Sequence, residues 1–376
     1  RNVQIGNERV LRARLDDAKF FFDGDRRKSL EGHREALSRI NYQEGMGTML
    51  DKSDRLVKLV EAIGEDWNFT DTEKADVRRA AYLSKSDLAT GMVTEFTELQ
   101  GEMGKEYALL DGEKPKVAAA IFEQYMPRFA GDVLPKSSIG RALSLSDKLD
   151  NLAATFLRRL IPTGSQDPFA LRRQTIGAVH ILTDGEIHWD VRKGVKMALA
   201  LLPGTQEEKD TAADKVEDFF RQRIKAILLD EGVDYDIVDA VLAGAIDDVY
   251  AIFLKAHSMM DSHVKGELEM RQAVTRLVNI TKGKSAVEIR PELFTEEAEK
   301  NLYAALEKAG EEVTNVYNAY DYGSALPALK TLTVPINQFL DSVMVMVEEE
   351  VVRNNRISLL INVLDVYSRC DFSKLV

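Results

Sequence analysis

The stretch SLSDKLDNLAATFLRRLIPTGSQDPFALRRQTIG, residues 144–177, marks the meeting of two helical segments. Its first half repeats leucine and phenylalanine at helical spacing, and the repeat stops at Pro162 and Gly164, which disfavour a helix interior. A second helix is expected after Asp167, whose carboxylate can accept hydrogen bonds from the first turn, with Pro168 in that turn. The stretch therefore predicts a helix, a break and a second helix.

Helical periodicity continues through nearly the whole chain, whereas strand-like alternation is scarce, so we predict an all-α fold. Thr70 followed by Glu73 has the form of a capping box and predicts a helix from Thr70 to about Leu88. Other helical segments are predicted at 87–103, 138–160, 233–257 and 325–346. Pro327 and Pro335 should bend or divide the last of these.

A chain of 376 residues is too long for one ordinary core and predicts several domains. Because it begins with Arg1 rather than Met, we expect it to be a fragment of a longer protein. Its single cysteine, Cys370, rules out an internal disulfide and favours a reducing compartment, the cytoplasm. A run of about eighteen apolar residues is absent, so no membrane-spanning segment is expected.

The charge of the chain is unevenly distributed. A formal net charge of -12 argues against generic, charge-driven attachment to nucleic acid or an anionic membrane. Residues 151–200 nevertheless hold 7 Lys and Arg against 4 Asp and Glu, whereas residues 201–250 hold 5 against 13. A local basic surface therefore stays open as a hypothesis. Two arginine pairs flank the break described above, Arg158 with Arg159 and Arg172 with Arg173.

The sequence contains no strong catalytic signature. Gly101–Lys105 reads GEMGK, which lacks the spacing of a phosphate-binding loop and the Ser or Thr that follows it. His257 and His263 bracket Asp261, but those helical spacings do not converge on one metal ion. Adjacent carboxylates project to different faces of a helix, whereas acid–base catalysis needs convergence. We therefore predict no catalytic residue and no metal site in this chain.

Several segments together resemble one protein family. They are Gly6–Asp25, Ala81–Ala108, Tyr125–Pro135, the stretch quoted first and Phe339–Leu364. In this order they resemble the beta subunit of the bacterial heterotetrameric glycyl-tRNA synthetase, and the string IPTGSQDPFALRR is highly specific. Since the family's beta subunit is much longer at its N-terminus, the resemblance implies that this chain is the C-terminal half.

The resemblance implies an HD-like helical domain, a helical body and a C-terminal helical anticodon-binding domain similar to that of arginyl-tRNA synthetase. The expected division is a lead-in at 1–40, the HD-like domain at 41–160, the body at 161–265 and the anticodon-binding-like domain at 266–376. In the family, the alpha subunit makes glycyl-adenylate and the beta subunit holds tRNA(Gly), within an alpha2beta2 assembly. ATP and Mg are therefore expected at the alpha subunit, with no cofactor and no active site in this chain.

An active HD phosphohydrolase holds metal with a His, a His-Asp pair and a later Asp. By order and spacing, the corresponding positions here are Gln43, Lys85 with Asp87, and Asp147. An amide and an ammonium cannot replace two imidazoles around a divalent cation, so Asp147 and Asp150 are expected to anchor hydrogen bonds or salt bridges instead. A metal phosphohydrolase, disfavoured on this ground, and a helical scaffold that only docks the alpha subunit are the alternatives.

An acidic protein that binds a polyanion must concentrate its lysines and arginines. Asn354 and Asn355 are further candidates for reading base edges in an unpaired loop. The candidate phosphate contacts are Arg271, Arg276, Lys282, Lys284, Arg353, Arg356, Arg158, Arg159, Arg172 and Arg173, and the candidate stacking aromatics are Tyr303, Tyr317, Tyr320 and Tyr322. A structural role stays open for both sets. Arginines at a domain junction also pair with carboxylates, and most aromatics at helical spacing belong to a core.

Overall fold

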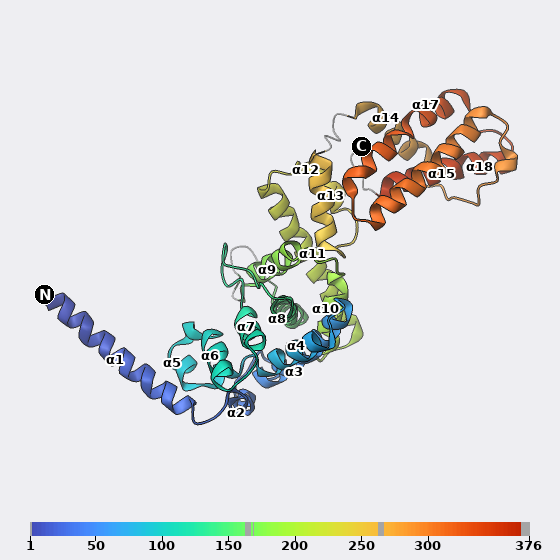
Figure 1. Ribbon diagram of the computed structural model, residues 1–376. Coiled ribbons are helices and arrows are strands. Elements are labelled where there is room, and N and C mark those ends of the chain that lie inside the picture. Colours follow the sequence, from blue (N-terminus) through green and yellow to red (C-terminus); the bar gives the residue numbers. More distant parts are fainter. Residues whose placement is uncertain (1, 162–166, 168, 262–266, 370–376) are drawn as a thin grey trace. The chain divides into compact units, whose positions relative to one another are not determined.

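All regular structure in the described residues is helical (Figure 1). The structure, a computed structural model, describes residues 2–161, 167, 169–261 and 267–369. Over these ranges, extended backbone pairs only at two isolated bridges, Asn41 with Thr48 and Asp190 with Asp248. The prediction of an all-α fold is confirmed.

The chain forms two compact units. Unit 1 is Arg1–Arg223 with Ile246–Val249, and unit 2 is Ile224–Ala245 with Tyr250–Val376. The long helix α11 (Gln206–Asp230) contributes to both. The four-part division expected from the family resemblance stays a prediction.

Helix α8 (Ser138–Leu157) is the central element of unit 1. It is buried along almost its whole length because apolar and small side chains occupy nearly every face. The helices that pack on it are α3 (Met49–Asp66), α4 (Asp71–Leu83), α7 (Pro115–Glu123), α9 (Leu171–Asp184) and α10 (Val191–Ala200). The remaining helices of this unit are α1 (Asn2–Asp25), α2 (Leu30–His33), α5 (Gly91–Glu95) and α6 (Glu102–Leu110), with short 3-10 turns at Arg34–Arg39, Ser86–Ala89 and Thr97–Leu99.

Helix α4 starts as predicted and ends early. Glu73 N–H donates to Thr70 Oγ1 at 3.3 Å and Thr70 N–H donates to Glu73 Oε2 at 3.0 Å, so the capping box is confirmed. The helix ends at Leu83 rather than near Leu88, because Lys85 adopts a left-handed conformation (φ 68°). The single helical segment predicted at 87–103 was also wrong, since this stretch is divided into two 3-10 turns, the short helix α5 and the start of α6.

The stretch at 144–177 contains a helix, a break and a second helix, with α8 ending at Leu157 and α9 beginning at Leu171. The Asp167 carboxylate accepts from the N–H of Leu171 at 2.8 Å and of Arg172 at 3.0 Å, so its predicted capping role is confirmed. The roles predicted for Pro162, Gly164 and Pro168 fall outside the described residues.

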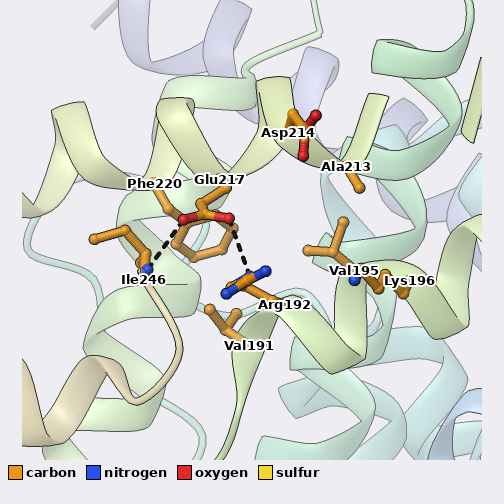
Figure 2. Close-up of a pocket in the computed structure, with 9 residues that line it drawn as sticks. All are labelled: Val191, Arg192, Val195, Lys196, Ala213, Asp214, Glu217, Phe220 and Ile246. Carbon is orange, nitrogen blue, oxygen red and sulfur yellow. Dashed lines mark hydrogen bonds and ion pairs between the residues drawn. The ribbon is translucent and has the colours of Figure 1, made fainter. Parts of the chain in front are cut away.

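Glu217 of α11 connects three parts of unit 1 around a small pocket (Figure 2). Its carboxylate lies 3.0 Å from Arg192 Nε of α10 and accepts from Arg221 and from the Ile246 N–H, both at 3.1 Å. The pocket holds about 20 Å³, the room of a single water molecule, so its role is structural.

The single helix predicted at 233–257 was wrong. It is divided into α12 (Tyr235–Val241) and α13 (Val249–Asp261), because the intervening residues return to unit 1. There the Val191 N–H donates to the Asp247 carbonyl at 2.9 Å, and His188 Nδ1 lies 2.8 Å from Asp248 Oδ2. These contacts remove the backbone between α12 and α13 from helical pairing.

Unit 2 ends in a helical bundle. Its elements after α13 are α14 (Leu268–Thr281), α15 (Glu297–Asn318), α16 (Ala325–Lys330), α17 (Thr333–Ser342) and α18 (Glu350–Arg369). Helix α15 packs on α16, α17 and α18, and α14 packs on α17 and α18. The predicted division of the segment at 325–346 is confirmed, because α16 ends at Lys330 and α17 begins at Thr333.

In the part of the chain that the structure describes, no helix is long and apolar enough to cross a membrane. The interpretations given to His263 and Cys370 lie outside the described residues.

Candidate functional site

The four positions that correspond to an HD metal site do not converge on one point. Lys85 Nζ donates to Asp147 Oδ2 at 3.1 Å, so this pair is brought together. Gln43 instead donates to Thr155 Oγ1 at 3.1 Å, and Asp87 Oδ2 accepts from the Gly101 N–H at 2.6 Å. An ammonium therefore occupies the place beside Asp147. Among the described residues, no group of three His, Cys, Asp or Glu side chains is arranged to hold a metal ion.

Two basic residues of α3 complete this cluster, and sequence reasoning missed both. Lys52 Nζ lies 3.0 Å from Asp147 Oδ1 and 2.9 Å from Asp150 Oδ2. Arg55 donates to both oxygens of Asp150, at 2.6 and 3.1 Å. The expectation that Asp147 and Asp150 anchor salt bridges is confirmed. Lys52 and Arg55 are three residues apart on one helix, and Asp147 and Asp150 are three residues apart on another. This matching spacing was the signal that could have predicted the pairing.

A third lysine, Lys148 of α8, lines the same pocket as Lys52 and Lys85. It has no carboxylate partner among the described residues. Its Nζ donates to the Met126 carbonyl and to Ser144 Oγ, both at 2.7 Å. Burial lowers the pKa of Lys148 to about 7, with Asp147 opposing the shift and Lys85 adding to it. Burial also lowers the pKa of Lys85, against the attraction of Asp147.

The carboxylates respond in the opposite direction. Burial disfavours the charged form of Asp147, but Lys52 and Lys85 outweigh it and hold its pKa below the ordinary value. The same balance, with Lys52 and Arg55 as the cations, lowers the pKa of Asp150. Both acids are therefore ionised at neutral pH.

A pocket of about 340 Å³ opens above the cluster, and basic side chains dominate its wall. Five cationic residues line it against the single carboxylate of Asp147. The cations are Lys52, Lys85, Arg128, Lys148 and Arg173, and the other polar lining residues are Tyr42, Gln100, Gln124, Tyr125, Asn151 and Gln174. The pocket is therefore suited to an anion.

The four arginines around 158–173 have different neighbours. Arg158 and Arg159 are exposed at the end of α8, and Arg158 lies 3.8 Å from Glu44 Oε2. Arg173 lines the lysine pocket, while the Arg172 backbone bonds to Asp167. The bidentate carboxylate pairing that was the second interpretation is not seen at Arg158, whose single ion pair is long.

The basic residues on and after α14 lie at the surface of unit 2. Arg276 lies 2.7 Å from Asp341 Oδ1 and donates to Asn337 Oδ1 at 3.1 Å. Lys282 is exposed, and half-buried Lys284 contacts Met346 Sδ at 3.5 Å. Arg271 is half-buried on the same helix.

The candidates on α18 hold their own domain together. Arg356 is buried and pairs with Glu299 at 2.8 Å. Asn355 is buried too, and its amide bonds the N–H and the carbonyl of Arg290 at 2.7 and 3.1 Å. Arg353 donates to the carbonyls of Val347 and Glu348, and Asn354 is half-buried. The helical pattern alone did not separate these packing contacts from contacts with a ligand.

The candidate aromatics form clusters within unit 2. Tyr317 and Tyr322 meet edge to face with ring centroids 4.7 Å apart, and Tyr320 lies 6.4 Å from Tyr322. Tyr303 packs against Phe294 at 5.5 Å. Tyr320, with 43% of its surface exposed, presents the largest accessible ring of the four.

Two family models match the chain. One, described as "Glycyl-tRNA synthetase beta subunit", matches residues 1–243, and the other, "DALR anticodon binding domain", matches residues 270–370. Proteins named glycine–tRNA ligase beta subunit are similar over the whole chain. Those of Desulforamulus reducens and Clostridioides difficile are 40% and 42% identical over 100% of this chain, covering 54% and 55% of the relatives. That of Halothermothrix orenii is 41% identical over 97% of this chain. The chain spans about half the length of these relatives.

Proposed function

Because the chain belongs to the family of glycyl-tRNA synthetase beta subunits, we propose that it binds tRNA(Gly) and positions it for ATP-dependent glycylation by a separate alpha subunit. The observation that carries this proposal is the match of residues 270–370 to an anticodon-binding domain. These residues comprise helices α14 to α18, which pack as one bundle in unit 2.

The proposed RNA contacts are the basic side chains that reach solvent. Arg271, Arg276, Lys282 and Lys284 form one set in unit 2, and Arg158, Arg159, Arg172 and Arg173 form another in unit 1. Phosphate contacts from such residues supply much of the affinity for RNA and make it sensitive to salt. Arg353, Asn355 and Arg356 act in this proposal through the loops that they hold, and Asn354 and Tyr320 remain candidates for base contacts.

The proposal assigns the chemistry to the alpha subunit. Glycyl-adenylate would form there from glycine and ATP with Mg, in an alpha2beta2 assembly in the cytoplasm. The donor set at the degenerate HD positions supports a non-catalytic role for this chain, since Lys85 and Gln43 stand where imidazoles would be needed.

The test is binding of tRNA(Gly) to the purified chain at about 50 and about 200 mM salt, where each phosphate contact contributes about one unit to the log–log slope. Lys282→Ala with Lys284→Ala should weaken binding and reduce the slope by about two units. Lys300→Ala with Lys308→Ala, two exposed lysines of α15, removes the same charge and should leave the slope unchanged.

Two results would contradict the proposal. A chain that binds the alpha subunit tightly but has no affinity for tRNA(Gly) in dilute buffer would be a scaffold only. A chain that makes glycyl-adenylate without the alpha subunit would hold an active site of its own.

A further inference from the structure

The lysine-lined pocket of unit 1 holds more positive than negative charge at its floor. Three buried lysines, Lys52, Lys85 and Lys148, line it together with the ionised Asp147. Asp150, which pairs with Lys52, is also paired with Arg55. The pKa of Lys148, about 7, leaves this lysine partly protonated at neutral pH. Burial raises the pKa of Asp87, the third buried acid nearby, against the Gly101 N–H and the charge of Lys85. Buried charge without a counter-charge is costly, and the fold nevertheless assembles these groups from helices α3 and α8 and the turn after α4.

Among the described residues, Lys85 and Lys148 each keep at least one N–H without a hydrogen-bond acceptor, and Lys85 Nζ lies 4.1 Å from the centroid of the Tyr125 ring. An ammonium has three N–H donors. Lys85 donates one to Asp147, and Lys148 donates two, to the Met126 carbonyl and Ser144 Oγ. The Tyr125 hydroxyl and Gln124 Oε1 are buried with no hydrogen-bond partner in the described ranges, and both residues line the pocket.

The rim adds one more cation. Arg128 is paired with Asp132 at 2.9 Å, so its charge is largely compensated. Arg173 is exposed at the pocket wall, and no carboxylate of the described residues pairs with it. A ligand in the pocket would therefore meet both ammonium groups and a guanidinium.

We propose that this pocket binds the terminal phosphate of a small phosphomonoester and holds it without hydrolysis. A phosphomonoester carries nearly two negative charges at neutral pH, against an excess of one to two positive charges on the buried groups, and a bound anion favours the protonated form of Lys148. A phosphodiester inside an RNA chain carries one charge and two bulky substituents. The volume of about 340 Å³ is at the lower end of ligand pockets and suits a molecule of mononucleotide size. The site shares Arg173 with the proposed tRNA contacts, whereas Lys85 and Lys148 belong to this pocket alone.

The test is isothermal titration of the full chain with adenosine 5′-monophosphate, inorganic phosphate and uncharged adenosine. The two phosphates should bind and adenosine should not, and the monophosphate should be recovered intact. Lys85→Met and Lys148→Met should each weaken binding about ten- to one-hundredfold, as expected for a lost charged hydrogen bond. Lys58→Met, an exposed lysine of α3, is the matched control and should bind as the wild type does.

Arg173→Ala changes an exposed side chain and so preserves the fold if a buried lysine variant unfolds. It should weaken monophosphate binding several-fold. Failure of the wild type to bind either phosphate at millimolar concentration would overturn the proposal, as would cleavage of the monophosphate. A third result would also contradict it. If Lys85→Met left the binding of the monophosphate unchanged and weakened only the binding of tRNA that carries a 5′-phosphate, the pocket would hold the end of a tRNA and not a small phosphomonoester.

Discussion

Arg356 Nε donates to Glu299 Oε1 at 2.8 Å, and this buried pair joins α18 to the first turn of α15. Glu299 also accepts from the N–H groups of Thr295 and Glu296, both at 2.9 Å, and so closes the helix start. One carboxylate therefore connects the last helix of the bundle to the beginning of its longest one.

Arg356→Ala should lower the free energy of unfolding of unit 2 by about 3–5 kcal/mol, because it leaves the Glu299 carboxylate buried and unpaired. Urea unfolding followed by circular dichroism measures the loss. Arg353→Ala is the control and should cost about 1 kcal/mol, since its donors go to two backbone carbonyls. A stable Arg356→Ala variant that has lost only tRNA affinity would make Arg356 a ligand contact.

Asp150→Asn should destabilise unit 1 by a similar amount, about 3–5 kcal/mol, because Asp150 is the shared partner of Lys52 and Arg55. Adding Lys52→Met should restore part of the loss, since one of the two stranded cations is then removed. A double-mutant cycle from thermal unfolding measures this coupling. Strict additivity of the two changes would mean that the pair does not interact.

Lys148 predicts an unusual dependence of stability on pH. Its pKa is about 7 in the folded chain, while an unfolded lysine titrates near its ordinary value of about 10.4. Between these values the unfolded state binds the proton and the folded state does not, so stability should rise with pH by up to about 1.4 kcal/mol per unit. Below about pH 7 both states are protonated and the contribution is constant.

Lys148→Met removes this dependence. The unfolding free energy of the wild type, measured in urea, should therefore rise relative to that of the variant as the pH increases from about 7 to about 10. Parallel curves over this range would show that the Lys148 ammonium is not destabilised by burial.

Arg158→Ala with Arg159→Ala should reduce the salt dependence of tRNA(Gly) binding by up to two units and leave thermal stability nearly unchanged, because both side chains are exposed. Lys58→Ala with Arg78→Ala removes the same charge from exposed sites on α3 and α4. Equal effects of the two double variants would indicate a general charge effect and no specific contact at the end of α8.

Asp167→Ala should destabilise the chain by about 1 kcal/mol, because two N–H groups at the start of α9 lose their acceptor. Asp167→Asn keeps one acceptor oxygen and should cost less. Equal losses in thermal unfolding would show that the charge, rather than the hydrogen bonds, stabilises this helix start.

Local features of the fold were well predicted, whereas long-range ones were not. The capping box of Thr70 and Glu73 and the capping carboxylate of Asp167 were identified, since each acts over three to five residues. The interruption after α4 was missed because Lys85, which adopts a left-handed conformation there, pairs with Asp147, 62 positions away. The break between α12 and α13 similarly depends on Glu217 accepting from Ile246.

The candidate site shows the same division. The sequence showed that neither position expected to hold an HD histidine has one, and that Asp147 and Asp150 lie on one helix. Lys148 carried no feature that distinguished it from a surface lysine, and for Lys52 the only signal was its three-residue spacing to Arg55. Likewise, the buried Arg356 and the exposed Arg158 were predicted alike as phosphate contacts.

By itself, the sequence determined that this chain is helical, where several of its helices begin, and which family it resembles, because spacing and capping are properties of neighbouring residues. Only the tertiary structure decided which charges are buried and which partners they meet. A lysine loses its water only when distant helices close over it, and then its pKa and its need for a counter-charge depend on those helices.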